Sequence, residues 1–161
     1  MGLIVWRLLV TTDVGKEQWT WWEILDTIFP YDANVYVRIF NRRGVLLVWS
    51  QLPGNQLMKL LMNRLTRAYR LVHFDDCCPA RLRDIIFTAK RLVGGLRDIS
   101  IESEVRGDYL GINEKELTDI LIRELNCLGG EKKLMVEVVW DIVGLSLSSR
   151  SEGVLRTKRT G

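Results

Sequence analysis

The first 75 residues alternate between short apolar runs and longer segments in which apolar residues recur with helical spacing. Apolar residues at every second position are typical of a strand, whereas a spacing of three or four is typical of a helix. Gly, Pro, Asn and Asp separate the segments, as turns require. The pattern predicts, in chain order, a strand Leu3–Thr11, a helix Glu17–Phe29, strands Asn34–Phe40 and Val45–Trp49, a helix Gln56–Ala68 and a strand Tyr69–Phe74.

The predicted order of these elements, βαββαβ, is that of a ferredoxin-like sandwich, in which two helices cover one face of an antiparallel sheet. The second half predicts the order αβαββ, from helices Pro79–Val93 and Glu114–Cys127 and strands Asp98–Arg106, Leu134–Val139 and Ile142–Leu147. We therefore expect an α+β protein with a ferredoxin-like domain at 1–75 and a second helix-on-sheet domain at 76–148. The tail at 149–161 is rich in Ser, Gly and basic residues, so we expect it to be flexible.

The tripeptide Arg106-Gly107-Asp108 is known from cell-adhesion loops, but its neighbours predict a local structural role. Gly107 can adopt the positive φ that a turn after a strand often needs. Asn113 is placed to cap the following helix, and Glu116, three residues later, would complete a capping box. We interpret the tripeptide as a strand-to-helix turn, with Arg106 at the end of the strand.

The composition is that of a globular protein that can bury a core, with 161 residues and 47% hydrophobic content. The three cysteines are an odd number without the spacing of a disulfide framework, which favours a reduced, intracellular protein. The opening MGLIVWRLLV is too short to span a membrane and reads as a buried strand. We expect a cytoplasmic protein that does not contact a membrane.

Catalytic and cofactor motifs are absent from the sequence, and we expect no metal or cofactor. His73 has no obvious partner. A Cys77-Cys78 nucleophile, for example in sulfur transfer, would lack a nearby base. Glu102 and Glu104 share one side of a strand and could do acid–base work, although a solvated strand face explains them more simply. These observations predict a non-catalytic protein.

Basic residues are concentrated between residues 33 and 74, which contain seven Lys or Arg and no acid. Such a block favours a surface that binds a polyanion, although an ordinary solvated helix face remains the alternative. Arg42 and Arg43 lie at a predicted hairpin tip. The six tryptophans, including Trp19, Trp21 and Trp22, could stack on bases, but at helical spacing they are more typical of a core. On the helix Gln56–Ala68 a cationic stripe is expected from Lys59, Asn63, Thr66, Arg67 and the following Arg70.

With these elements in order, the chain resembles proteins that carry a THUMP domain after a ferredoxin-like module. The stretch LLVTTDVGKEQWTWWEILD is similar to the opening of such proteins, with Thr11, Thr12, Gly15 and Glu17 before and within the first helix. The hairpin RRGVLLV and the strand YRLVHFD fit the same module. The stretches ISIESEVRGDYLGINEKELTDILIREL and KKLMVEVVWDIVGLSLS are similar to the THUMP domain itself.

The resemblance implies binding of the tRNA acceptor stem and 3′ end, and not of DNA. A protein of this size looks most like an adaptor that presents tRNA to a separate modifying enzyme, with a cytidine acetyltransferase favoured. Because A-form RNA is recognised through phosphates, ribose hydroxyls and shape, cations should make the contacts. The candidate RNA-binding residues are Lys59, Arg64, Arg67, Arg70, Lys90, Arg91, Arg97 and Arg106. The alternative is a regulatory module that binds a protein or small ligand.

Overall fold

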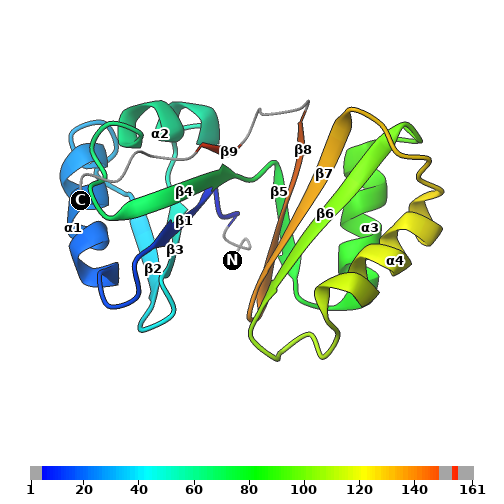
Figure 1. Cartoon of the computed structure of the whole chain (residues 1–161). Coiled ribbons are helices and arrows are strands. Elements are labelled where there is room, and N and C mark those ends of the chain that lie inside the picture. Colours follow the sequence, from blue (N-terminus) through cyan, green and yellow to red (C-terminus); the bar gives the residue numbers. More distant parts are fainter. Residues whose placement is uncertain (1–4, 149–153, 156–161) are drawn as a thin grey trace. The chain divides into compact units, whose positions relative to one another are not determined.

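The computed structural model describes residues 5–148 and 154–155 (Figure 1). The described residues form two compact units, one of 5–74 together with 154–155, and one of 75–148. Both units combine helices with a β-sheet, so the fold class is α+β, as predicted.

The first unit contains the expected order of six elements, followed later in the chain by a short strand. Its sheet has the strand order β2-β3-β1-β4-β9, and all of its pairings are antiparallel. Helices and strands together enclose an apolar core that includes Ile24, Leu46 and Leu57, all fully buried. The elements are β1 (Leu8–Thr12), α1 (Glu17–Ile28), β2 (Tyr36–Phe40), β3 (Val45–Trp49), α2 (Gly54–Leu61), β4 (Ala68–His73) and β9 (Val154–Leu155).

Helix α2 ends at Leu61, seven residues before the predicted end at Ala68. The prediction failed because Leu65 and Ala68 continue the helical spacing of three or four residues from Leu57 and Leu61 and are themselves buried. However, Leu65 reaches the core from an irregular segment, and Ala68 is the first residue of β4. Buried residues therefore keep the spacing of a helix beyond Leu61, where the helical backbone has already ended.

The buried face of α1 also differs from the prediction. Its buried residues are Glu17, Thr20, Ile24 and Ile28, which recur at intervals of three or four. Trp19 and Trp22 lie on the other side of the helix and are 52% and 56% exposed. The two large indoles that looked like core residues are therefore on the surface.

The C-terminal tail was expected to be flexible throughout, but Val154–Leu155 pairs with β4 as an antiparallel strand. Leu155 lies opposite Leu71, and Val154 lies opposite Val72. Two adjacent apolar residues can pair with an open sheet edge even within a polar segment. The rest of the predicted tail, and the start of the first predicted strand at residues 3 and 4, lie outside the described residues.

The second unit is a four-stranded sheet with the order β5-β8-β7-β6. β6 and β7 are parallel, whereas β7 with β8 and β8 with β5 are antiparallel. Helices α3 and α4 lie on one side of this sheet (Figure 1), where they pack on an apolar core that includes Ile85, Leu117 and Val136. The elements are β5 (Asp76–Pro79), α3 (Leu82–Val93), β6 (Ile99–Arg106), α4 (Glu114–Leu125), β7 (Lys132–Val139) and β8 (Ile142–Ser148).

Strand β5 was not predicted, because we took Pro79 as the start of a helix. In the structure Cys77 pairs with Gly144 and Cys78 pairs with Val143, at the edge of the sheet. An edge strand tolerates Pro, since one side of its backbone needs no ladder partner. The helix begins only at Leu82, after this strand has ended.

The turn at Arg106-Gly107-Asp108 connects β6 to the segment before α4, as predicted. Gly107 has φ of 85°. Asn113 caps α4, because its side-chain oxygen accepts from the backbone N–H of Glu116 at 2.9 Å. The Glu116 carboxylate accepts in return from the Asn113 backbone N–H at 3.4 Å, which completes the capping box.

Candidate nucleic-acid interface

Three of the candidate cations of the first unit lie on α2 or in the segment that follows it. Lys59 and Arg64 are exposed, and neither forms an ion pair with another residue of the described chain. Arg67 is partly buried, and its guanidinium carbon lies 5.9 Å from the centre of the Trp19 ring. Helix α2 ends at Leu61, between Lys59 and Arg67, so these two residues do not belong to the single helical stripe that we predicted. Lys59 and Arg64 remain available to an anionic ligand.

Arg70 is in a different position from the other three. It lies in β4 opposite Thr11 of β1, and only 7% of the residue is exposed. The prediction placed it after a helix that continued to Ala68, but strand β4 begins at that residue. Its place within the sheet removes Arg70 from the exposed cationic surface.

The segment after α2 is attached to α1 by a side-chain network centred on Thr66. The Glu23 carboxylate accepts from the Thr66 backbone N–H at 3.1 Å and from its hydroxyl at 2.9 Å. The indole N–H of Trp19 donates to the same Thr66 oxygen at 3.1 Å. Thr66, predicted to be a surface hydrogen-bonding residue, therefore holds Arg64 and Arg67 close to the exposed side of α1.

Two buried carboxylates in the first unit have structural roles. Glu17 accepts from the backbone N–H of Gly44 at 3.1 Å. Burial raises the pKa of this carboxyl, but several backbone N–H donors outweigh that effect and lower the pKa below its ordinary value. Asp32 accepts from the hydroxyl of Ser50 at 2.6 Å, and this bond lowers the Asp32 pKa. Both carboxylates bind the backbone or hydroxyl groups of connecting segments, which explains their burial.

The second unit carries three exposed candidates, and each has a partner within that unit. Lys90 lies 3.9 Å from Glu124 of α4, with both side chains about half exposed. Arg91 is ion-paired with Asp76 and lies 5.6 Å from the centre of the exposed Phe87 ring. The Nε of Arg97 donates to the backbone oxygen of Asn126 at 3.2 Å. Exposed pairs of this kind contribute little to stability, so a phosphate can compete for the cations.

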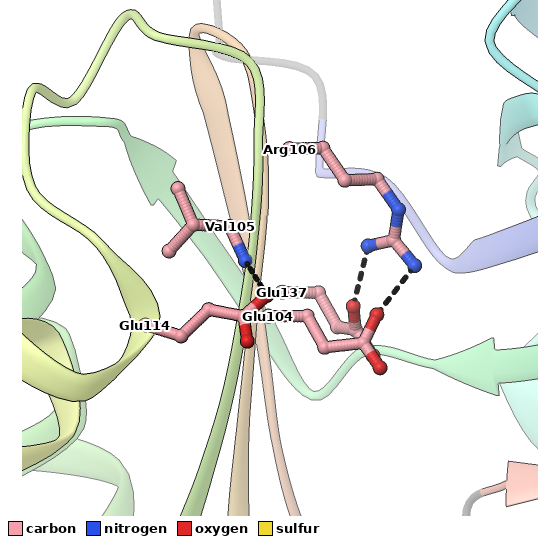
Figure 2. A network of polar contacts seen from close by, with 5 residues as sticks. All are labelled: Glu104, Val105, Arg106, Glu114 and Glu137. Atoms are coloured by element: carbon pink, nitrogen blue, oxygen red, sulfur yellow. Dashed lines mark hydrogen bonds and ion pairs between the residues drawn. The ribbon is translucent and has the colours of Figure 1, made fainter.

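Arg106, the eighth candidate, is bound by two carboxylates of its own sheet (Figure 2). One guanidinium nitrogen donates to Glu137 and another to Glu104, each at 2.7 Å. Glu104 and Glu137 are register partners on the parallel strands β6 and β7. The Arg106 side chain is 18% exposed, and that of Glu137 is 2% exposed. This geometry gives Arg106 a structural role within the sheet.

The predicted alternatives for catalysis receive no geometric support from the described residues. Glu104 is bound to Arg106, and Glu102 is paired with Lys133 at 2.8 Å. Burial raises the pKa of the Cys78 thiol to about 11, which keeps it protonated at neutral pH and unreactive as a nucleophile. All three cysteines are free thiols.

Among the described residues, no cluster of His, Cys, Asp and Glu is arranged to hold a metal ion. No helix among the same residues is long and apolar enough to cross a membrane.

The architecture occurs in several solved structures. PH1313 from Pyrococcus horikoshii Ot3 is similar at 12% identity, with a TM-score of 0.69 over 94% of this chain and 55% of that chain. TrmN from Thermus thermophilus is similar at 16% identity, with a TM-score of 0.60 over 91% and 46%. A 4-thiouridine synthetase in complex with RNA and ATP is similar at 9% identity, with a TM-score of 0.52 over 90% and 42%. No protein-family model matches the chain, and no curated protein sequence matches it.

The chain spans about half the length of these solved chains. At such low identities the likeness shows a shared fold. It also corrects our prediction of a non-catalytic protein, because a chain with this architecture is a synthetase, that is, an enzyme. The absence of catalytic motifs therefore does not exclude an enzyme.

Proposed function

We propose that this chain binds tRNA through exposed cations of both units, and that it does so as part of a tRNA modification system. The observation that carries the proposal is the acid-free region of the first unit, in which Lys59 and Arg64 are exposed without an ion-pair partner in the described chain. The fold shared with an RNA-bound 4-thiouridine synthetase supports RNA as the polyanion. The resemblance to THUMP proteins favours the acceptor stem and 3′ end.

The contacts would be made to phosphates and ribose hydroxyls. A-form RNA has a deep major groove that side chains cannot enter, so an A-form stem is bound mainly through its backbone and shape. Arginine suits this role because its planar guanidinium can donate two hydrogen bonds to one phosphate. We include the exposed Lys90, Arg91 and Arg97 and the partly buried Arg67 as phosphate or ribose contacts.

The role within the modification system is to present tRNA to a catalytic domain. The THUMP resemblance favours a cytidine acetyltransferase as that partner. The catalytic domain can belong to a separate protein or to the same polypeptide, and the proposal applies to both arrangements. Mass spectrometry of tRNA nucleosides from cells that lack this chain tests it, with loss of acetylated cytidine as the expected result. If acetylcytidine is unchanged and another modified nucleoside is lost, the partner is a different modifying enzyme and not the acetyltransferase.

Binding is tested directly by titration of a tRNA mixture at several salt concentrations. Each phosphate contact makes the slope of log K against log salt more negative by about 0.7 to 0.9. The double variant Lys59→Glu and Arg64→Glu loses about two contacts, so its slope should be less negative by about 1.4 to 1.8. The matched control is Lys115→Glu with Arg123→Glu, which reverses two exposed charges on α4. Equal loss of affinity in both double variants would indicate a general charge effect and contradict the proposed surface. A native chain that does not bind tRNA would refute the function itself.

A further inference from the structure

Two tryptophans are exposed on the same side of α1. Trp19 and Trp22 are 52% and 56% exposed, and residues three apart on a helix are neighbours on its surface. The opposite side of the helix, with Thr20, Ile24 and Ile28, is buried in the core. Adjacent exposed indoles are uncommon unless they meet a ligand or partner, because they leave a large apolar area in water.

Trp19 is held in one orientation by the network around Thr66. Its indole N–H donates to the Thr66 hydroxyl oxygen at 3.1 Å, and that hydroxyl is bound to Glu23 at 2.9 Å. The polar edge of the ring is thus satisfied within the protein, while 52% of the residue remains exposed. A ring fixed in advance loses little conformational entropy when a ligand stacks on it.

Cations lie next to these rings. The guanidinium carbon of Arg67 is 5.9 Å from the Trp19 ring centre, and Arg64 is exposed three residues earlier in the same segment. The Glu23 carboxylate is occupied by Thr66, and the exposed Asp26 lies one turn beyond Trp22. Fixed aromatic faces beside Arg side chains are what single-stranded nucleic acids bind, since the bases stack and the phosphates meet the cations.

We propose that Trp19, Trp22 and Arg67 form a stacking platform for unpaired nucleotides of the bound RNA. The platform rests on the proposed function, and it gives the first unit a role that the cations alone do not provide. Cations contact the backbone of any RNA, whereas the indoles select nucleotides whose bases are free to stack. A protein partner would also bury tryptophan, but the absence of acids over residues 33–74 favours an anionic ligand.

The test uses two RNA probes with the full chain. One is a short single-stranded RNA that contains 2-aminopurine, whose fluorescence falls when the base stacks. The other is a blunt RNA duplex without unpaired nucleotides, which reports on backbone binding alone. We expect Trp19→Leu with Trp22→Leu to weaken binding of the single strand about tenfold or more, because each stacked base contributes substantially to affinity. Binding of the duplex should change less than about twofold.

Two further variants control for structural damage. Trp19→Phe keeps an aromatic face without the indole N–H and should retain most of the single-strand affinity. Tyr31→Leu removes another aromatic ring of the first unit, one that is 62% exposed, and should leave both affinities unchanged. Loss of duplex binding in the double Trp variant, with Trp19→Phe weakening neither probe, would show that the rings act on any RNA and would contradict a platform for unpaired nucleotides.

The outcomes separate this inference from the proposed function. Single-strand binding that survives the double Trp substitution, or native binding that leaves 2-aminopurine fluorescence unchanged, would overturn the platform and indicate a different occupant such as a protein. Native binding of duplex and tRNA in the same experiment would leave the proposed function intact. If the native chain binds neither tRNA nor duplex, the proposed function fails whatever the single-strand result.

Discussion

Replacement of Arg106 by Leu is expected to destabilise the second unit strongly and to leave RNA affinity nearly unchanged. In the structure the guanidinium is bound by Glu104 and Glu137, each at 2.7 Å. Leu removes the positive charge but leaves the Glu137 carboxylate in place, where only 2% of the side chain is exposed. A buried charge that loses the opposite charge bound to it is costly, because the free energy lost by taking it out of water is then less well compensated.

The size of the effect follows from the burial of each partner. Removal of one member of a buried pair costs about 3 to 5 kcal/mol, and the 18% exposure of Arg106 favours the lower end. The bond to Glu104, whose side chain is 39% exposed, adds at most about 1 kcal/mol. A unit of this size has a total stability of only about 4 to 11 kcal/mol, at roughly 0.05 to 0.15 kcal/mol per residue. A loss of about 3 kcal/mol corresponds to a Tm lower by about 12 °C or more.

The assay is thermal and urea unfolding of the native chain and three variants, followed by tRNA titration at a temperature where all are folded. Arg106→Leu with Glu137→Leu should recover most of the lost stability, because an apolar pair avoids the unpaired charge. The control is Lys133→Leu, which breaks the exposed pair with Glu102 and should cost less than about 1 kcal/mol. The reasoning is refuted if Arg106→Leu is as stable as the native chain, or if the double variant is no more stable than Arg106→Leu. Large loss of RNA affinity in a folded Arg106→Leu variant would instead restore Arg106 as an RNA contact.

Three further substitutions test other parts of the fold. Asn113→Ala removes the helix cap of α4 and should lower the free energy of unfolding by about 1 kcal/mol, measured with urea. Gly107→Ala should destabilise more than a surface substitution, since φ is 85° and a Cβ would meet the Trp140 ring. An unchanged Tm in circular dichroism melting would contradict this strain. Asp32→Asn tests a pH dependence: the pKa of Asp32 is lowered in the fold, so its contribution is present above the ordinary value of 3.8 and is lost as the pH falls below it. The stability difference between native and Asp32→Asn should therefore shrink in acid, and a difference that is constant with pH would contradict the role of the carboxylate.

Local signals in the sequence were sufficient for the turn before α4. The capping box of Asn113 and Glu116 and the positive φ of Gly107 follow from residues within one short segment, so sequence reasoning could find them. Strand β5 was missed for the opposite reason. Cys77 and Cys78 form a strand only because β8, more than sixty residues later, supplies their partners.

The candidate RNA-binding residues likewise include some that the sequence could identify and some that it could not. The acid-free block and the exposed Lys59 and Arg64 could be recognised from the sequence, since charge is a property of composition. The positions of Arg70 and Arg106 could not, because a charged residue in a strand can face either solvent or other groups of its sheet. Their burial depends on register partners that local periodicity does not identify.

The sequence alone determined the alternation of helices and strands, the α+β class and the location of the basic block, because these depend on local periodicity and charge. The tertiary structure decided which of the similar side chains are exposed. Thr20, Ile24 and Ile28 of α1 face the core of the first unit, so Trp19 and Trp22 are left outside, with Trp19 next to Arg67. Hydrophobicity would have placed the indoles inside, but burial is decided by the helix face that meets the sheet, and that contact is set by residues far away in the chain.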